Sequence, residues 1–176
     1  MILPDNTEPI REVSVSGIRL RFAASHMATL GSVLEPLHGH NYVVSCRVEG
    51  NLTEDNWVMD FSVLKQLLRS QCELLDHKFL LQMNSDQLSI VLQKESRSYV
   101  ITHGDRTYHI PSSDVVALPI ENSTAELIAE HIAEAVISDI SSANVTNLRK
   151  ITLEVEEMPG QSGIYTRVLP SHTKDR

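Results

Sequence analysis

Three histidines have the clearest capacity for chemistry in this sequence. His38 and His40 are two positions apart around Gly39, so in a strand both imidazoles point to the same face. His26 ends an earlier run of alternating apolar residues, and an antiparallel pairing of the two runs would bring it opposite the pair. Three converging imidazoles suit Zn²⁺ and leave a fourth coordination position open. We therefore predict a zinc site at His26, His38 and His40; the alternative is three ordinary histidines that cluster by chance.

The strand that would carry His26 is indicated by apolar residues at mostly every second position over residues 13–24. A second alternating run covers residues 42–48, and the two runs predict an antiparallel pair. After Asp60, a predicted N-cap, apolar residues recur at helical spacing over residues 61–75. The first half of the chain therefore predicts two strands followed by one helix.

The second half predicts the reverse order, a helix followed by two strands. A capping-box pattern at residues 123–126 precedes apolar residues at helical spacing over residues 127–140. Alternating runs at residues 151–157 and 163–169 predict the last two strands. Two strands, two helices and two strands predict an α+β subunit, with helices on one face of a small sheet and exposed edges that oligomerisation would cover.

The segment between the two helices, residues 85–119, is predicted to be a hairpin-like insertion. Short strands are expected at residues 88–92, 99–101 and 107–110. His103 and His109 are interpreted as loop residues, because no third ligand aligns with them.

Composition limits the possible partners and the compartment. The 176 residues predict one domain over residues 1–176, and a net charge of −8 makes nucleic acid an unlikely ligand. The first nine residues lack the features of a secretory signal, and no apolar run reaches membrane-spanning length. Cys46 and Cys72 are expected to be reduced thiols, so we expect a cytoplasmic protein without membrane contact.

Five short motifs resemble the family of 6-pyruvoyl-tetrahydropterin synthase and 6-carboxy-tetrahydropterin synthase. They are Phe-Ala-Ala-Ser-His at 22–26, His-Gly-His-Asn-Tyr at 38–42, Val-Met-Asp-Phe at 58–61, Leu-Asp-His-Lys at 75–78 and Asn-Ser-Thr-Ala-Glu at 122–126. Five motifs in register are far more specific than any one of them. The resemblance implies a T-fold that assembles as an oligomeric barrel, a hexamer, with active sites at subunit interfaces. It also implies that the three histidines bind zinc and that the substrate is a pterin.

The resemblance assigns further residues to the site. Asp76 and His77 stand where the family has a pair that transfers protons. A carboxylate held against an imidazole raises the basicity of the imidazole, which suits it to act as a base. Glu157 matches the family's pterin anchor, a carboxylate that can accept two parallel hydrogen bonds from the ring. Thr124 and Glu126 resemble further pocket residues. A helix cap is the alternative role of Asp76, and the capping box is that of Glu126.

The sequence departs from the family at one position. Members that make the 6-pyruvoyl or 6-carboxy product carry a catalytic cysteine shortly before the His-Gly-His motif, and this sequence has none there. Glu35 stands three residues before His38, which resembles a variant branch with glutamate in place of the cysteine. That branch is associated with cleaving 7,8-dihydroneopterin triphosphate to 6-hydroxymethyl-7,8-dihydropterin. We therefore predict a zinc-dependent lyase that uses Glu35 as base in a retro-aldol-type step.

Three other functions remain open from the sequence. The first is 6-pyruvoyl- or 6-carboxy-tetrahydropterin synthesis from the same substrate, with Glu35 in place of the thiol. The second is a non-catalytic pterin-binding protein with structural zinc. The third is an unrelated zinc hydrolase, which would need no pterin anchor at Glu157.

Overall fold

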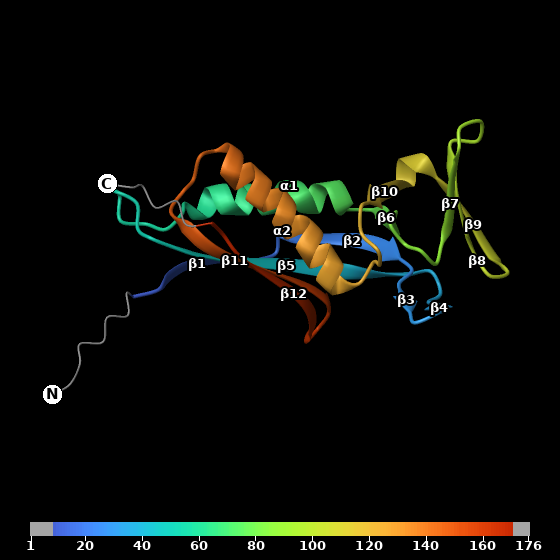
Figure 1. Ribbon diagram of the computed structural model, residues 1–176, viewed down its shortest axis with the longest axis horizontal. Coiled ribbons are helices and arrows are strands. Elements are labelled where there is room, and N and C mark those ends of the chain that lie inside the picture. The colour runs from blue at the N-terminus through green and yellow to red at the C-terminus, as the bar shows by residue number, and fades with distance from the viewer. Residues whose placement is uncertain (1–8, 171–176) are drawn as a thin grey trace.

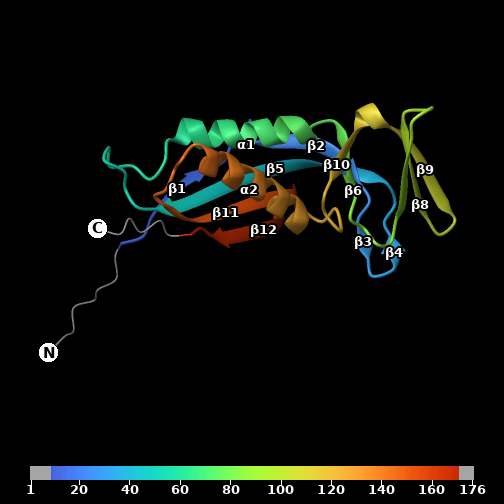
Figure 2. The same ribbon diagram turned by 45° about the horizontal axis from the view of Figure 1, so that its top comes forward.

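The fold is a twisted sheet with two helices over one of its faces (Figures 1 and 2). The computed structural model describes residues 9–170, so the ends of the predicted domain, residues 1–8 and 171–176, lie outside it. Seven strands of the described residues form the main sheet: β1 (Arg11–Val15), β2 (Arg21–His26), β5 (His38–Gly50), β6 (Lys78–Gln82), β10 (Val115–Leu118), β11 (Leu148–Met158) and β12 (Gln161–Val168). The helices are α1 (Phe61–Leu75) and α2 (Ala125–Ser142).

Strand β5 is the central strand of the sheet. The order is β10-β6-β2-β5-β11-β12, and β1 also pairs with β5. The predicted antiparallel pairing of β2 with β5 is confirmed. The prediction of one strand over residues 13–24 is wrong, because a turn at Gly17, with φ 138°, separates β1 from β2. The turn leaves Ile18 exposed, so apolar alternation alone could not locate the break.

Each of the two helices packs one apolar face against the sheet. Asp60 is the N-cap of α1, as predicted, and its carboxylate accepts a hydrogen bond from the Ser62 amide at 2.6 Å. The buried face of α1 is Leu64, Leu68, Cys72 and Leu75. Phe61, which was assigned to this stripe, is instead exposed. The buried face of α2 is Ala125, Ile128, Ala129, Ile132, Ala133, Val136 and Ile140. Each large aliphatic side chain buried in this way contributes about 1.5–3 kcal/mol.

The start of α2 differs from the predicted capping box. Thr124, not Ser123, is the N-cap, and its side chain accepts a hydrogen bond from the Leu127 amide. Glu126 is then the second residue of the helix, one position short of where a capping-box glutamate reaches back. Its carboxylate is consequently available for another role.

The insertion is more elaborate than a hairpin. Strands β7 (Ser89–Gln93), β8 (Ser98–His103) and β9 (Arg106–Pro111) form a separate three-stranded antiparallel sheet at one end of the molecule (Figure 1). The three short strands lie close to their predicted positions. They are followed by a single 3-10 turn, Ser112–Asp114, and by β10, which returns to the main sheet parallel to β6. We did not predict β6 and β10, whose continuous apolar residues show no alternation.

A second apolar cluster joins the insertion to the main sheet. Its buried members are Met27, Leu34, Phe79, Leu81, Leu88 and Ile101, and we call them the insertion cluster. Leu34 belongs to a small hairpin of β3 (Thr29–Leu30) and β4 (Val33–Leu34). This hairpin connects β2 to β5 along the chain. The cluster therefore packs the insertion against the segment that leads to Glu35.

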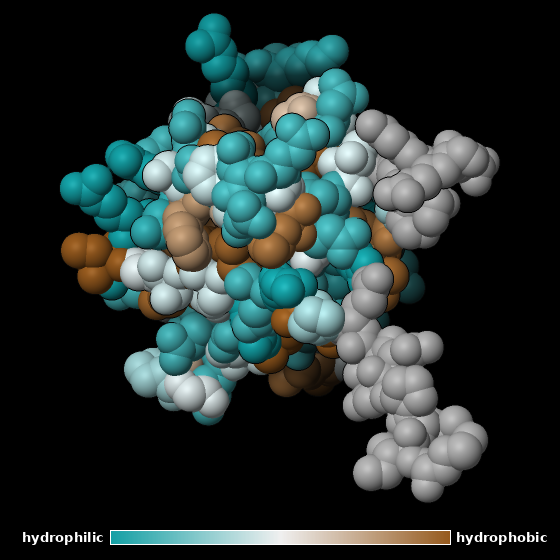
Figure 3. All heavy atoms as spheres, turned by 90° about the vertical axis from the view of Figure 1, so that its left-hand side faces the viewer, coloured by the Kyte–Doolittle hydropathy of each residue, from teal (hydrophilic) through white to brown (hydrophobic). Residues whose placement is uncertain are grey.

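The surface of the described residues shows no sign of membrane insertion by a helix. Neither helix within residues 9–170 combines the length and apolarity that crossing a bilayer requires. At the end of the molecule where α1 begins, small apolar areas are divided by hydrophilic side chains (Figure 3). Trp57 and Phe61 are among the exposed large apolar side chains of the described residues.

Gly163 generates a testable prediction about the packing of β12 against α2. A Cβ at this position would lie 2.3 Å from the Ala125 carbonyl carbon and from the Glu126 amide nitrogen, which are backbone atoms that cannot rotate away. We expect Gly163→Ala to lower the free energy of unfolding by about 1–3 kcal/mol, measured by urea denaturation. The exposed neighbour Ser162→Ala is the control. Equal stability of the two variants would show that α2 is not held this closely.

Candidate active site

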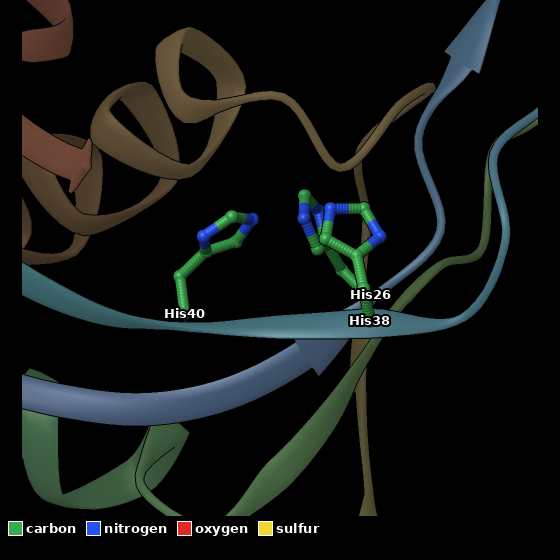
Figure 4. A group of neighbouring side chains, drawn as sticks. All are labelled: His26, His38 and His40. Atoms are coloured by element: carbon green, nitrogen blue, oxygen red, sulfur yellow. The ribbon is translucent and has the colours of Figure 1, made fainter.

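The three histidines converge on one point, as predicted (Figure 4). His26 ends β2 and is directly opposite His38 in the register with β5, while His40 pairs with Ala24. The ring centroid of His26 lies 4.6 Å from that of His38 and 5.3 Å from that of His40. One ligand nitrogen from each ring can be chosen so that all three lie within 4.8 Å of one another. The cluster is therefore consistent with a metal site.

Gly39 allows the two strands to approach closely between the histidines. A Cβ at this position would lie 2.7 Å from the Ala24 carbonyl oxygen, which belongs to the β2 backbone. A larger residue would push β5 away from β2 and separate His38 from His26. The glycine of the His-Gly-His motif is thus a packing requirement of the metal cluster.

Backbone carbonyls orient two of the imidazoles for metal binding. Nδ1 of His26 lies 2.8 Å from the Ser123 carbonyl oxygen, and Nδ1 of His38 lies 2.8 Å from that of Pro36. A carbonyl only accepts hydrogen bonds, so each Nδ1 carries the proton and each Nε2 keeps a free lone pair. This is the tautomer that a metal ion needs, and sequence reasoning did not anticipate its two carbonyl partners.

His26 supplies the sharpest test of whether a metal fits. Its Nε2 is buried and forms no hydrogen bond within the described part of the chain, which leaves a polar atom unsatisfied. Burial lowers the pKa of His26, and this favours the neutral imidazole that coordinates metal. Three imidazoles match the ligand set of catalytic zinc, which leaves a fourth position for water or substrate. The donor set therefore fits Zn²⁺.

Glu157 lies beside the metal cluster, not at a distance from it. Its Oε1 is 3.3 Å from Nε2 of His26 and 3.5 Å from Nε2 of His40. The Tyr42 hydroxyl donates a hydrogen bond to the same carboxylate at 3.3 Å. Tyr42 was not predicted as a site residue, although it has the same strand parity as His38 and His40.

A cavity of about 310 Å³ is lined by the three histidines and by four other predicted site residues. Its walls include Glu35, Glu157, Thr124 and Glu126. Oε2 of Glu35 lies 4.0 Å from Nε2 of His38. The carboxylates therefore come from the β4–β5 connection, from β11 and from the start of α2, and they line the same cavity as the three histidines.

Asp76 and His77 are placed elsewhere. His77 lines a different cavity, which also includes Ser25 and His40, and Asp76 lines a third cavity beside the end of α1. The two adjacent residues can face each other because α1 ends at Leu75 and His77 has a φ of 58°. Nδ1 of His77 lies 2.8 Å from Oδ2 of Asp76. Within one chain, this pair is not part of the histidine cavity.

Asp76 also connects the end of α1 to β2. Its Oδ1 accepts a hydrogen bond from the Ala23 amide at 2.7 Å, and the His77 amide donates to the Ala23 carbonyl at 2.7 Å. Asp76 is thus both the predicted helix cap and the partner of His77. The backbone hydrogen bond from Ala23, followed by the interaction with His77, lowers the pKa of the Asp76 carboxyl despite some opposing desolvation.

Neither cysteine can replace the missing catalytic thiol. Cys46 and Cys72 are both free and buried, and neither lines the histidine cavity. Burial raises the pKa of each thiol to about 12, so the reactive thiolate is scarce at neutral pH.

Comparison with known proteins assigns the chain to a family. The profile of the family described as 6-pyruvoyl tetrahydropterin synthase matches residues 17–168. The chain belongs to this family. It is therefore an enzyme of pterin metabolism, and its histidine cluster is consistent with the metal of zinc-dependent family members. Membership removes the non-catalytic binding protein and the unrelated zinc hydrolase from the alternatives.

Curated relatives from two archaea cover most of the chain. A protein of Methanocaldococcus jannaschii is 28% identical over 151 residues, which are 85% of this chain and 91% of that protein. A protein of Pyrococcus abyssi is 32% identical over 140 residues, or 78% and 80% of the two chains. Both carry the provisional name 6-carboxy-5,6,7,8-tetrahydropterin synthase.

Solved structures from two malaria parasites are similar to the whole fold. A variant of Plasmodium vivax 6-pyruvoyltetrahydropterin synthase, in which a catalytic glutamate is replaced by alanine, superposes with a TM-score of 0.85 at 34% identity. The enzyme of Plasmodium falciparum gives the same TM-score at 33% identity. In both comparisons the match covers 92% of this chain and 100% of the other.

The histidine cluster predicts metal-dependent stability. We expect the purified protein to bind about one zinc ion per chain, and His26→Ala to abolish binding because it removes one of three ligands. Zinc at a hundredfold excess over its dissociation constant should raise the free energy of unfolding by about 2.7 kcal/mol. Metal analysis and thermal denaturation measure the two effects. His103→Ala is the control; equal zinc loss in both variants would contradict this site.

Asp76 predicts a pH dependence of stability. Its carboxyl has a lowered pKa in the folded protein, so its stabilisation is present above the unfolded-state pKa and is lost as pH falls through the folded value. We expect Asp76→Asn to be less stable than the wild type at pH 7. The difference should shrink as the pH falls below about 4, the unfolded-state pKa of an aspartate, and through the lower folded-state pKa. Urea denaturation across this range, with Glu54→Gln as control, measures it; a pH-independent difference would contradict the assignment.

Proposed function

We propose that this protein is a zinc-dependent lyase that cleaves 7,8-dihydroneopterin triphosphate to 6-hydroxymethyl-7,8-dihydropterin. The observation that carries the proposal is the carboxylate of Glu35 in the histidine cavity, 4.0 Å from Nε2 of His38. It stands where synthases of the family carry a thiol. A glutamate is also described as the catalytic residue of the similar Plasmodium vivax enzyme, which supports a chemical role for Glu35.

His26 and His38 would hold the zinc ion through Nε2, and His40 would supply the third nitrogen. When bound, the ion supplies Lewis-acid chemistry that lowers the pKa of the substrate's side-chain hydroxyls.

Glu35 acts as the base on the substrate side chain. It removes the proton of the second side-chain hydroxyl, and the bond between the first and second side-chain carbons breaks. The electron pair of that bond enters the conjugated imine of the pterin ring, and a proton then returns to the first side-chain carbon. The products are the hydroxymethyl pterin and a two-carbon aldehyde that keeps the triphosphate. No oxidant or reductant is needed, and a carboxylate suffices as base.

Glu157 anchors the pterin ring in this proposal. A carboxylate accepts two parallel hydrogen bonds from the 2-amino group and the adjacent ring N–H. The Tyr42 hydroxyl, which donates to Glu157, restricts the orientation of that carboxylate. Thr124 and Glu126, at the start of α2, complete the wall on that side of the cavity.

Asp76 and His77 reach a site through assembly of the chain into a homo-oligomer, a hexamer in the family pattern. Within one chain neither residue lines the histidine cavity, so a second copy would supply the pair to it. Exposed apolar side chains at Leu30, Val33 and Leu37 adjoin the histidine strands and support burial against another copy. The pair then serves in proton transfer, with the Asp76 carboxylate orienting the His77 imidazole.

A second candidate is 6-pyruvoyl- or 6-carboxy-tetrahydropterin synthesis from the same substrate. The names of the similar proteins favour this candidate over side-chain cleavage. It shares the metal ligands, the anchor and the base with the first candidate. The preference for cleavage rests on the carboxylate at Glu35, because that reaction requires no thiol.

Product analysis separates the two candidates. The zinc-loaded protein is incubated with 7,8-dihydroneopterin triphosphate, and the products are identified by mass spectrometry. We expect 6-hydroxymethyl-7,8-dihydropterin, and we expect Glu35→Gln to lower kcat by about 10²–10⁴-fold as a lost general base does. Glu54→Gln, at an exposed loop position, is the control. A 6-pyruvoyl or 6-carboxy product would instead establish the second candidate, and undiminished turnover in Glu35→Gln would remove Glu35 as the base.

A further inference from the structure

The insertion makes specific contacts with the loop that carries Glu35. Arg106 is the first residue of β9, directly after the tight β8–β9 turn at Gly104, and its side chain is half-buried. Its guanidinium donates hydrogen bonds to the backbone carbonyls of Leu34 and Glu35, more than 70 residues earlier in the chain. The hydroxyl of Tyr108, two residues further along β9, accepts another at 3.4 Å.

These hydrogen bonds hold the backbone of Glu35 from one side. From the other side, its amide donates to the Ala28 carbonyl at 2.9 Å. The next residue back, Leu34, is only 2% exposed and is packed in the insertion cluster. Both peptide groups of Glu35 and the side chain of Leu34 are therefore held in place. Apart from the hydrogen bond to Ala28, each of these contacts involves residues of the insertion.

Other contacts hold the rest of this loop: Thr29 pairs with Leu34 in the β3–β4 hairpin, and the Pro36 carbonyl accepts a hydrogen bond from His38. Asn122 fixes its beginning through two hydrogen bonds with the backbone of Thr29, at 2.9 and 2.8 Å. The residues on either side of Leu34 and Glu35, at 31–33 and 36–37, are exposed. Arg106 is thus the side chain that holds the carbonyls of Leu34 and Glu35, and His38 holds that of Pro36.

The chemistry of Arg106 suits this task. Its planar guanidinium can donate to two carbonyls at once, and each of these hydrogen bonds is charge-assisted. No carboxylate among residues 9–170 forms an ion pair with it, so its charge is committed to the loop backbone and to Tyr108. A base displaced by about 1 Å from its substrate can lose about 10²-fold in rate, so a fixed backbone at Glu35 has catalytic value.

We propose that Arg106 is a positioning residue for Glu35, and that the insertion sheet is the brace that holds the catalytic loop against the histidine cavity. The inference rests on the proposed function only in assigning Glu35 as the base. The brace itself is a property of the backbone contacts between β9 and residues 34–35.

The first test measures the brace without reference to activity. Hydrogen exchange followed by mass spectrometry reports on residues 28–37 in the zinc-loaded protein. Arg106→Ala should accelerate exchange at the Glu35 amide about tenfold, because the loop opens more often when its carbonyl hydrogen bonds are lost. Lys94→Ala removes a positive charge from the exposed β7–β8 turn of the same insertion and is the matched control. Unchanged exchange in Arg106→Ala would overturn the brace.

The second test measures whether the brace acts through Glu35. Arg106→Ala should lower kcat about 10–100-fold while KM changes less than about threefold, and Lys94→Ala should change neither. In a Glu35→Gln background, adding Arg106→Ala should lower kcat by less than about twofold, since the positioned carboxylate is already absent. Additive losses would overturn the positioning role.

Two further measurements separate loss of the brace from unfolding of the insertion and from failure of the proposed function. Arg106→Gln keeps part of the aliphatic stem and replaces the alanine variant if circular dichroism shows that alanine unfolds the insertion. If the wild type forms no product from 7,8-dihydroneopterin triphosphate, the proposed function fails, whereas faster exchange in the Arg106 variants would still support the brace.

Discussion

The site depends first on the register between β2 and β5. This register places His26 opposite His38, and Gly39 allows the strands to approach so closely that a Cβ would contact the Ala24 carbonyl. A slip of one residue would direct every side chain of a strand to the other face and disperse the imidazoles. The hydrophobic core enforces the register, because Phe22, Ala24 and Tyr42 are buried on the same face as the histidines. Core packing and metal geometry are therefore one constraint.

Other elements complete the site around that fixed pair of strands. The segment before α2 orients His26 through the Ser123 carbonyl, and the start of α2 forms a wall because β12 packs against it at Gly163. The insertion contacts the loop that carries Glu35 through Arg106, which does not itself line the cavity. The residues that line the cavity thus come from segments more than 100 residues apart in the sequence, and only the folded chain brings them together.

Sequence reasoning located what periodicity and motif spacing encode. The strand pairing, the two helices, the convergence of His26 and His38, and the Asp60 cap all follow from local patterns. It did not find β6, because a strand buried on both faces shows no alternation, or β10, whose four apolar residues are too few to show a period. It also did not find the carbonyl partners of the imidazoles, Tyr42 beside Glu157, or the contact of Arg106 with the loop. These depend on long-range packing, which no local spacing records.

The placement of Asp76 and His77 outside the histidine cavity has a consequence for the proposed assembly. Each chain would then contribute the metal half of one centre and the proton-transfer half of another. A chain with a damaged imidazole could still complete its neighbour's centre, and a chain with a damaged Asp76 could still hold zinc. Mixed assemblies of two separately defective chains would regain part of their centres, so co-expression of two such variants would restore activity that each lacks alone.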